Sequence, residues 1–175
     1  MNTIIILITF FNYNLVQFSE NEHISTQILN TINNESTLFL TKKKKIPKCI
    51  FGEIDRLTKD DFRLVNPDKK FRPTDKIEDQ TISNRRLIFA ANYGNDWVIY
   101  YEKGGRAYNT LLVFAEISGK KVKYLNGMNL QVISDPKRLK DKKEELQIIN
   151  DALKNGSYRL FYSSREKLEK EIINF

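Results

Sequence analysis

The sequence predicts an α+β domain in which helices flank an antiparallel sheet, and three observations support this fold class. The chain has 175 residues, a length that suits one domain. Between about residues 86 and 125, short turns separate apolar runs, as in successive antiparallel strands. Apolar stripes at helical spacing lie on both sides of this region. We therefore expect a four-stranded meander over about 86–125, flanked by an N-terminal helix and two C-terminal helices.

The beginning of the chain resembles a bacterial signal peptide. Residues 1–19 contain no charged side chain, and residues 4–11 form an apolar run of the length found in signal peptides. Asn12 and Asn14 make a longer membrane span poor, and Ser19 offers a small residue for cleavage. We expect removal of residues 1–19 and a periplasmic or secreted product. The alternatives are a buried first strand in a cytoplasmic protein and an uncleaved anchor. A membrane is expected as a partner only if the anchor is uncleaved.

Residues 20–45 are predicted to form an N-terminal arm and a basic linker. Ile24, Ile28 and Ile32 follow helical spacing, which predicts a short helix or a partly ordered arm. Pro47 follows a run of four basic residues, for which a solvated linker is the simplest interpretation. The alternative is a basic patch for phosphate groups, formed by Lys42, Lys43, Lys44 and Lys45. Residues 46–175 are then expected to be a single α+β domain.

The four strands of the meander are expected at residues 87–91, 96–102, 108–118 and 121–125. Turns rich in Gly and Asn separate the first three strands. In the second strand, Trp97 and Tyr101 share one face and Tyr100 lies on the other, because side chains alternate along a strand. In the last strand, Val122 and Tyr124 are expected to point inward together.

Two helices are expected after the meander. Asp135, which precedes a proline, is a good N-cap, and Asn155 with the next glycine is a stop signal. An apolar stripe supports this helix, consisting of Leu139, Leu146, Ile149 and Leu153. Residues 158–162 suit a further strand. Ser163 with Glu166 three residues later matches a capping box, which predicts a last helix near the end of the chain.

Composition excludes several function classes. The single Cys and single His cannot form a disulfide within the chain or a Cys/His zinc site. We expect Cys49 to be a buried structural thiol and His23 an exposed polar residue. Dinucleotide and P-loop fingerprints are absent, so no cofactor and no metal are expected. The net charge of +7 favours acidic partners, but nucleic acid is not the expected one, because RNA-recognition, zinc-finger and basic-zipper signatures are absent.

The most distinctive string of the sequence runs from residue 100 to residue 108. Its two glycines permit backbone conformations in which successive N–H groups converge on an anion, which Arg106 would clamp. The alternative is a hairpin turn that simply needs glycine. If the protein has a ligand site, we expect it here, formed by Trp97, Tyr100, Gly104, Gly105, Arg106 and Tyr108.

These observations favour a small exported binding or accessory protein that does no chemistry, such as an inhibitor- or immunity-type protein. Its partner is expected to be an unidentified protein or a small anionic ligand. One alternative is a basic protein that binds nucleic acid or another polyanion. A second alternative is a cofactor-independent hydrolase, which would need a cleft with perturbed carboxylates. The carboxylate pairs available for it are Asp60 with Asp61, Glu144 with Glu145, and Asp75 with Asp79.

Overall fold

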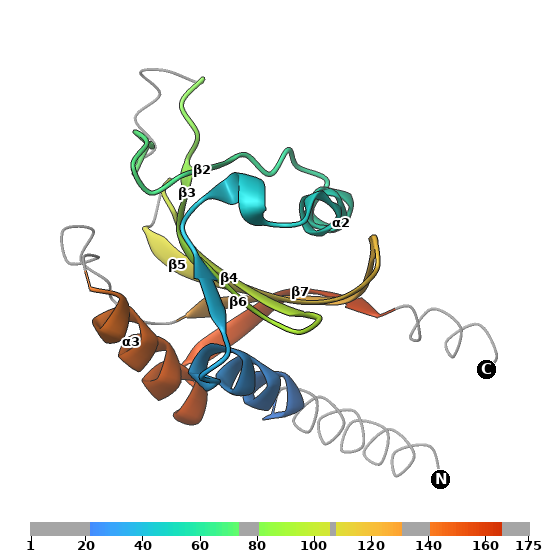
Figure 1. Ribbon diagram of the computed structural model, residues 1–175. Helices are drawn as coiled ribbons and strands as arrows, with labels where there is room; N and C mark the ends of the chain where they lie inside the picture. Colours follow the sequence, from blue (N-terminus) through green and yellow to red (C-terminus); the bar gives the residue numbers. More distant parts are fainter. Residues whose placement is uncertain (1–21, 74–80, 106–107, 131–140, 166–175) are drawn as a thin grey trace, which may run out of the picture.

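The structure is a computed structural model that describes residues 22–73, 81–105, 108–130 and 141–165 (Figure 1). Predictions that fall on residues 1–19, Arg106 and Asp135 lie outside this part of the chain. A first helix covers residues 22–33. The elements that follow are β1 (Leu38–Leu40), the 3-10 turn η1 (Lys43–Lys45), α2 (Lys48–Thr58), β2 (Leu64–Val65), β3 (Arg85–Tyr93), β4 (Asp96–Lys103), β5 (Asn109–Ser118), β6 (Lys121–Leu130), α3 (Lys142–Lys154) and β7 (Tyr158–Arg165).

The α+β class with an antiparallel sheet is confirmed, but within the described residues the sheet has seven strands rather than four. The strand order is β1-β3-β4-β5-β6-β7, and every pair along it is antiparallel. The short strand β2 pairs in parallel with the start of β3. The four predicted strands are β3 to β6, and β6 extends to Leu130, five residues further than expected. The prediction missed β1 and β2 because they are only three and two residues long.

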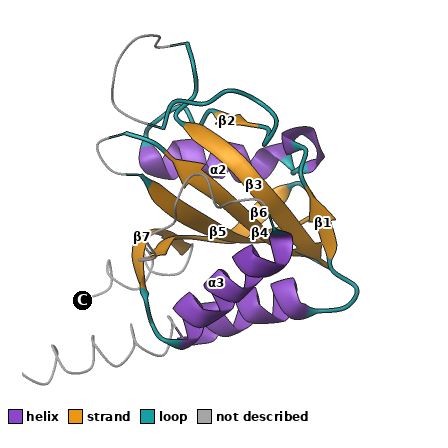
Figure 2. Cartoon of the chain, turned by 90° about the vertical axis from the view of Figure 1, so that its left-hand side faces the viewer, coloured by secondary structure: helices purple, strands orange, loops and turns teal. Residues whose placement is uncertain are grey.

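Helices cover both faces of the sheet. Figure 1 shows α2 on one side, and the first helix and α3 together on the other. Figure 2 shows the same layers from the side. We call the two sides the α2 face and the α3 face. The α2 face buries Ile50 and Ile54 of α2 against the sheet. The α3 face buries apolar side chains of both of its helices, namely Ile24, Ile28, Ile32, Ile149, Ala152 and Leu153.

Alternation along the strands assigns side chains to the two faces as predicted, with one exception. Trp97 and Tyr101 pack in the core of the α2 face, and Tyr100 packs in the core of the α3 face. Val122 and Tyr124, expected on the same side, contact opposite cores. The reason is a bulge: Tyr124 pairs with Glu116 and Val122 with Ile117, so the residue between them is not paired with a residue of β5 and the alternation shifts by one.

The segment expected to be an arm and a linker contributes to the core and to the sheet. The first helix buries its isoleucine stripe, and β1 pairs with β3. The first helix also contacts α3 and the start of β7. The hydroxyl of Ser25 donates to that of Tyr158 at 2.8 Å, and the amide of Asn33 donates to Asn150 at 2.9 Å.

The C-terminal part differs from the prediction in two ways. Within the described residues α3 begins after Asp141, whose side chain accepts a hydrogen bond from the backbone N–H of Lys143. It ends at Lys154, directly before the predicted stop at Asn155, so the end of this helix agrees with the prediction. Ser163 lies inside β7, so it does not cap a helix. The rest of the predicted last helix lies outside the described residues. No helix in the described part of the chain is both long and apolar enough to cross a membrane.

Candidate functional site

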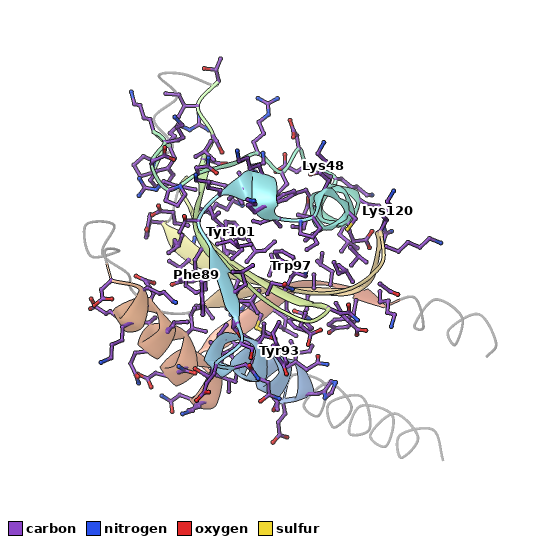
Figure 3. The ribbon with its side chains drawn as sticks, viewed as in Figure 1. Lys48, Phe89, Tyr93, Trp97, Tyr101 and Lys120 are labelled. Atoms are coloured by element: carbon purple, nitrogen blue, oxygen red, sulfur yellow. The ribbon has the colours of Figure 1, made fainter. Side chains whose placement is uncertain are left out.

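A pocket of about 610 Å³ opens on the α2 face, between the C-terminal end of α2 and one end of the sheet. This volume is in the range of small-molecule sites. Five strands, the end of α2 and the loops next to them supply its walls, so the strands position most of the side chains. Its polar and charged lining consists of Thr58, Asp60, Asn84, Arg85, Lys103, Asn109, Asn129 and Arg159. Figure 3 shows Tyr101, which also lines the pocket, on the α2 side of the sheet.

Positive charge exceeds negative charge in this pocket. Arg85 is buried and forms an ion pair with Asp60, with Nη2 and Oδ2 at 2.6 Å. The hydrogen bond from Arg85 holds the pKa of Asp60 below its usual value, and the charge of Lys103 adds to this effect. Burial lowers the pKa of Lys103, and the charge of Arg85 lowers it further. The carboxylate of Asp60 is therefore the shared counter-charge of two neighbouring cations, Arg85 and Lys103. Arg159 adds a third cation from β7.

Two asparagine amides lie between these cations. Asn109 begins β5 and Asn129 lies in β6, and the amide of Asn129 donates to the oxygen of Asn109 at 3.5 Å. That distance is at the limit of a hydrogen bond, so a ligand group can replace the interaction at little cost. The apolar side chains that complete the pocket are Ile54, Phe62 and Leu111. The pocket can therefore hold an organic molecule with an anionic group, and it offers hydrogen bonds to the neutral part of that molecule.

Backbone geometry explains both glycines of the distinctive string. Gly104 lies against the strap formed by Arg72 and Pro73, and a Cβ atom at this position would come within 2.6 Å of the Pro73 backbone. The N–H of Gly105 donates to the Pro73 carbonyl at 3.4 Å, and Gly105 has a φ of 138°, which favours glycine. Both glycines line the pocket. Gly104 and Gly105 are therefore required by the local backbone packing and also form part of the pocket wall.

The other residues of the predicted constellation do not meet at the pocket. Trp97 is buried on the α2 face but lies at the opposite end of β4 (Figure 3). Tyr100 lies on the α3 face with no exposed surface. Tyr108 donates its hydroxyl hydrogen bond to Glu102. Arg106 lies outside the described residues. The structure therefore brings Gly104 and Gly105 together with residues that the sequence analysis did not select.

The α3 face holds a buried polar cluster of its own. Glu102 is 1% exposed, and its carboxylate accepts hydrogen bonds from Arg86 and Tyr108. Tyr100 lies near the carboxyl of Glu145 and the hydroxyl of Thr110, and burial raises the pKa of Tyr100 well above its usual range. Within the described residues, one buried oxygen each of Tyr100, Thr110 and Glu145 has no hydrogen-bond partner of good geometry. Neither Glu102 nor Glu145 lines the pocket.

The buried carboxyl of Glu145 makes stability depend on pH. Burial raises its pKa, the hydroxyl of Tyr100 partly offsets this, and the charges of Glu144 and Glu102 raise it further. A carboxyl group whose pKa is raised by folding costs no stability below its unfolded pKa of about 4.5, where it is neutral in both states. Above that pH, the protein loses stability as the pH rises through the folded pKa. Glu145→Gln keeps the shape without the charge. We expect the variant to gain stability relative to the native protein as pH rises from 4 to 8.

Urea unfolding at a series of pH values measures this difference. Glu35→Gln is the control, because Glu35 is exposed and is not among the charges that raise the pKa of Glu145, so this variant should keep the slope of the native protein. Parallel pH profiles for the native protein and Glu145→Gln would contradict the prediction.

The remaining sequence candidates lie elsewhere on the molecule. Lys43 to Lys45 form η1, and the ammonium group of Lys43 lies over the ring of Phe51 at 5.6 Å. Lys42, Lys44 and Lys45 are exposed. His23 is exposed, as expected. Cys49 is a free thiol that is partly rather than fully buried and packs against the core of the α2 face.

Sequence reasoning missed the charged residues of the pocket, although one signal for them was present. Lys103 lies an even number of residues from Trp97 and Tyr101 in the same strand, and Asn109 lies two residues from Leu111, so each shares a face with those residues. Extending the face assignment to the strand ends would have placed Lys103 and Asn109 side by side on the α2 face. Arg159 gave no such signal, because its place depends on the strand order. Asp60 was considered only as one carboxylate of a hydrolase pair, and its place at the pocket depends on the loop after α2.

Comparison with known proteins gives no assignment. No family of known proteins, no curated protein and no solved structure matches this chain. Within the described residues, no group of three or more His, Cys, Asp or Glu side chains is arranged to hold a metal ion.

Proposed function

We propose that this protein is a non-enzymatic binding protein for a small anionic organic molecule, which it holds in the pocket of the α2 face. The observation that carries the proposal is Lys103, whose charge is half-buried in the pocket. The described residues contain no ion pair of Lys103, because the neighbouring carboxylate of Asp60 is bound by Arg85. Lys103 and Arg85 share the single carboxylate of Asp60, so the pocket keeps an excess positive charge whose partial burial is unfavourable, and a ligand anion would remove that penalty.

The lining supports binding rather than catalysis. The carboxylate of Asp60 is held by an arginine, and its lowered pKa makes it a poor proton donor or acceptor near neutral pH. The other polar groups of the pocket are amides, a hydroxyl and cations, which recognise an anion without transferring protons. Arg85 is fixed over the ring of Phe62 at 5.1 Å, which positions it without exposing it fully to the ligand.

Removal of the Lys103 ammonium group tests the proposal. The probe is N-butyrylglycine, a small monocarboxylate that carries an amide. We expect it to shift the backbone amide NMR signals of Lys103, Gly104 and Asn109 in the native protein. Lys103→Ala should weaken its binding roughly tenfold, since a charge-assisted hydrogen bond and an ion pair are lost.

Lys120→Ala is the control, because this lysine is exposed on the hairpin between β5 and β6 (Figure 3). It should bind the probe like the native protein. Equal binding by Lys103→Ala and the native protein would overturn the proposal, as would shifts confined to Lys42 to Lys45. The latter result would favour a polyanion-binding surface instead, and its affinity should then fall steeply with salt.

Export of the protein belongs to the same proposal and is tested separately. We infer from the apolar segment at residues 1–19 that the mature protein begins near residue 20 and acts in the periplasm or outside the cell. The intact mass of the native protein after cell fractionation should show the loss of about 19 residues. A full-length product in the cytoplasm would refute export while leaving the ligand pocket unaffected.

A further inference from the structure

We propose that the ligand is an elongated dicarboxylate with an amide or similar polar group between its two carboxylates. This inference rests on the proposed function and specifies the class of molecule. The observation behind it is the order of the polar side chains across the pocket, which the strand order and the register determine.

Two adjacent rows of paired residues form the sheet side of the pocket. In the first row Arg85 pairs with Lys103, and Lys103 with Asn109. In the second row Leu111 pairs with Asn129, and Asn129 with Arg159. All of these residues line the pocket. Moving from β4 to β7, a ligand therefore meets a cation, two amides and a second cation.

The two outer cations are suited to one carboxylate each. Arg85 is neutralised by Asp60, which leaves Lys103 as the excess charge at one side. Arg159 is the cation at the other side, and the described residues contain no ion pair of Arg159. A carboxylate carries a single negative charge, whereas a phosphate dianion would need two excess cations at one end. Two monovalent anionic ends therefore balance the pocket.

The separation of the strands that carry the two cations suits an elongated molecule. Three strand spacings separate β4 from β7, which places the backbones of Lys103 and Arg159 about 14 Å apart. The side chains of Lys103 and Arg159 line one pocket from two sides, so an elongated molecule can bind both cations at once. The middle of the ligand then lies over Asn109 and Asn129, whose weak mutual hydrogen bond at 3.5 Å can be exchanged for bonds to an amide.

Four probes of matched length test this inference by calorimetric titration of the whole protein. N-succinylglycine has two carboxylates separated by an amide, and N-butyrylglycine is the same molecule with one carboxylate replaced by a methyl group. Pimelate and heptanoate form the equivalent pair without the amide. We expect each dicarboxylate to bind roughly tenfold more tightly than its monocarboxylate partner. N-succinylglycine should also bind more tightly than pimelate.

Arg159→Ala should abolish the advantage of the dicarboxylates while leaving the binding of the monocarboxylates unchanged. Arg56→Ala, which alters an exposed arginine on α2, is the control and should keep the advantage. Equal affinity for dicarboxylates and monocarboxylates, with Lys103→Ala still weakening both, would overturn the inference and leave the proposed function standing. If Lys103→Ala has no effect on any probe, the proposed function itself fails.

Discussion

Glu102→Ala is expected to lower the free energy of unfolding by about 3 kcal/mol. Glu102 is 1% exposed and accepts hydrogen bonds from Arg86 and Tyr108. Removal of one partner of a buried ion pair leaves the other charge without compensation, and such changes cost about 3–5 kcal/mol. We expect the lower end of that range, because the side chain of Arg86 keeps 26% exposure and rests on the ring of Phe71 at 4.1 Å.

Denaturant unfolding measures this loss, with Glu116→Ala as the control. Glu116 also lies in a strand and forms an ion pair with Lys123 at 3.1 Å, but both side chains are partly exposed. Exposed ion pairs contribute about 0–1 kcal/mol, so the control should be nearly neutral. If both variants lose the same stability, the buried position of Glu102 is not the cause.

Gly104→Ala is expected to destabilise the protein by about 3 kcal/mol, although it adds only one methyl group. The three atoms nearest to a Cβ at this position belong to the backbone of Arg72 and Pro73. The strap cannot move away easily, because the N–H of Arg72 donates to Ser83 at 2.9 Å and Phe71 is buried beneath it. Overpacking against backbone is relieved only by moving the strap or the end of β4.

Gly52→Ala is the matched control for this substitution and has the opposite expected sign. Gly52 lies inside α2, and a Cβ there would meet no atom within 4 Å. Alanine should therefore stabilise α2 by about 0.5–1 kcal/mol. Thermal unfolding of the two variants measures both effects. A Gly104→Ala protein as stable as the native one would show that the strap packs less closely than described.

The sequence was most informative where side chains alternate over several residues. The strands β3 to β6 and the faces of Trp97, Tyr100 and Tyr101 could be predicted, because alternation decides both strand and face. The bulge opposite Glu116 could not, because an extra residue in a strand leaves no mark in the apolar pattern. For β7, residues 158–162 were predicted, but its last residues resembled a helix cap in isolation. Their pairing with β6 overrides that local preference.

The candidate site could be predicted only in part, for a related reason. Proximity in sequence placed Tyr100, Gly104 and Tyr108 in one constellation, whereas a strand sends neighbouring residues to opposite faces. The pocket instead collects residues from β3 to β7 and from the end of α2. Recognition of Arg159 requires the knowledge that β7 lies beside β6, which depends on long-range pairing and not on local pattern.

The contacts of the first helix with α3 and β7 determine when the protein can finish folding. Ser25 meets Tyr158 across 133 residues, and Asn33 meets Asn150 across 117 residues. Contacts so distant in sequence slow folding. During synthesis the first helix therefore lacks these two contacts until α3 and β7 have emerged, and the part of the α3 face that α3 covers stays exposed until then. A ribosome-stalled or truncated chain that ends after β6 should be captured by chaperones or aggregate, even though its central strands are complete.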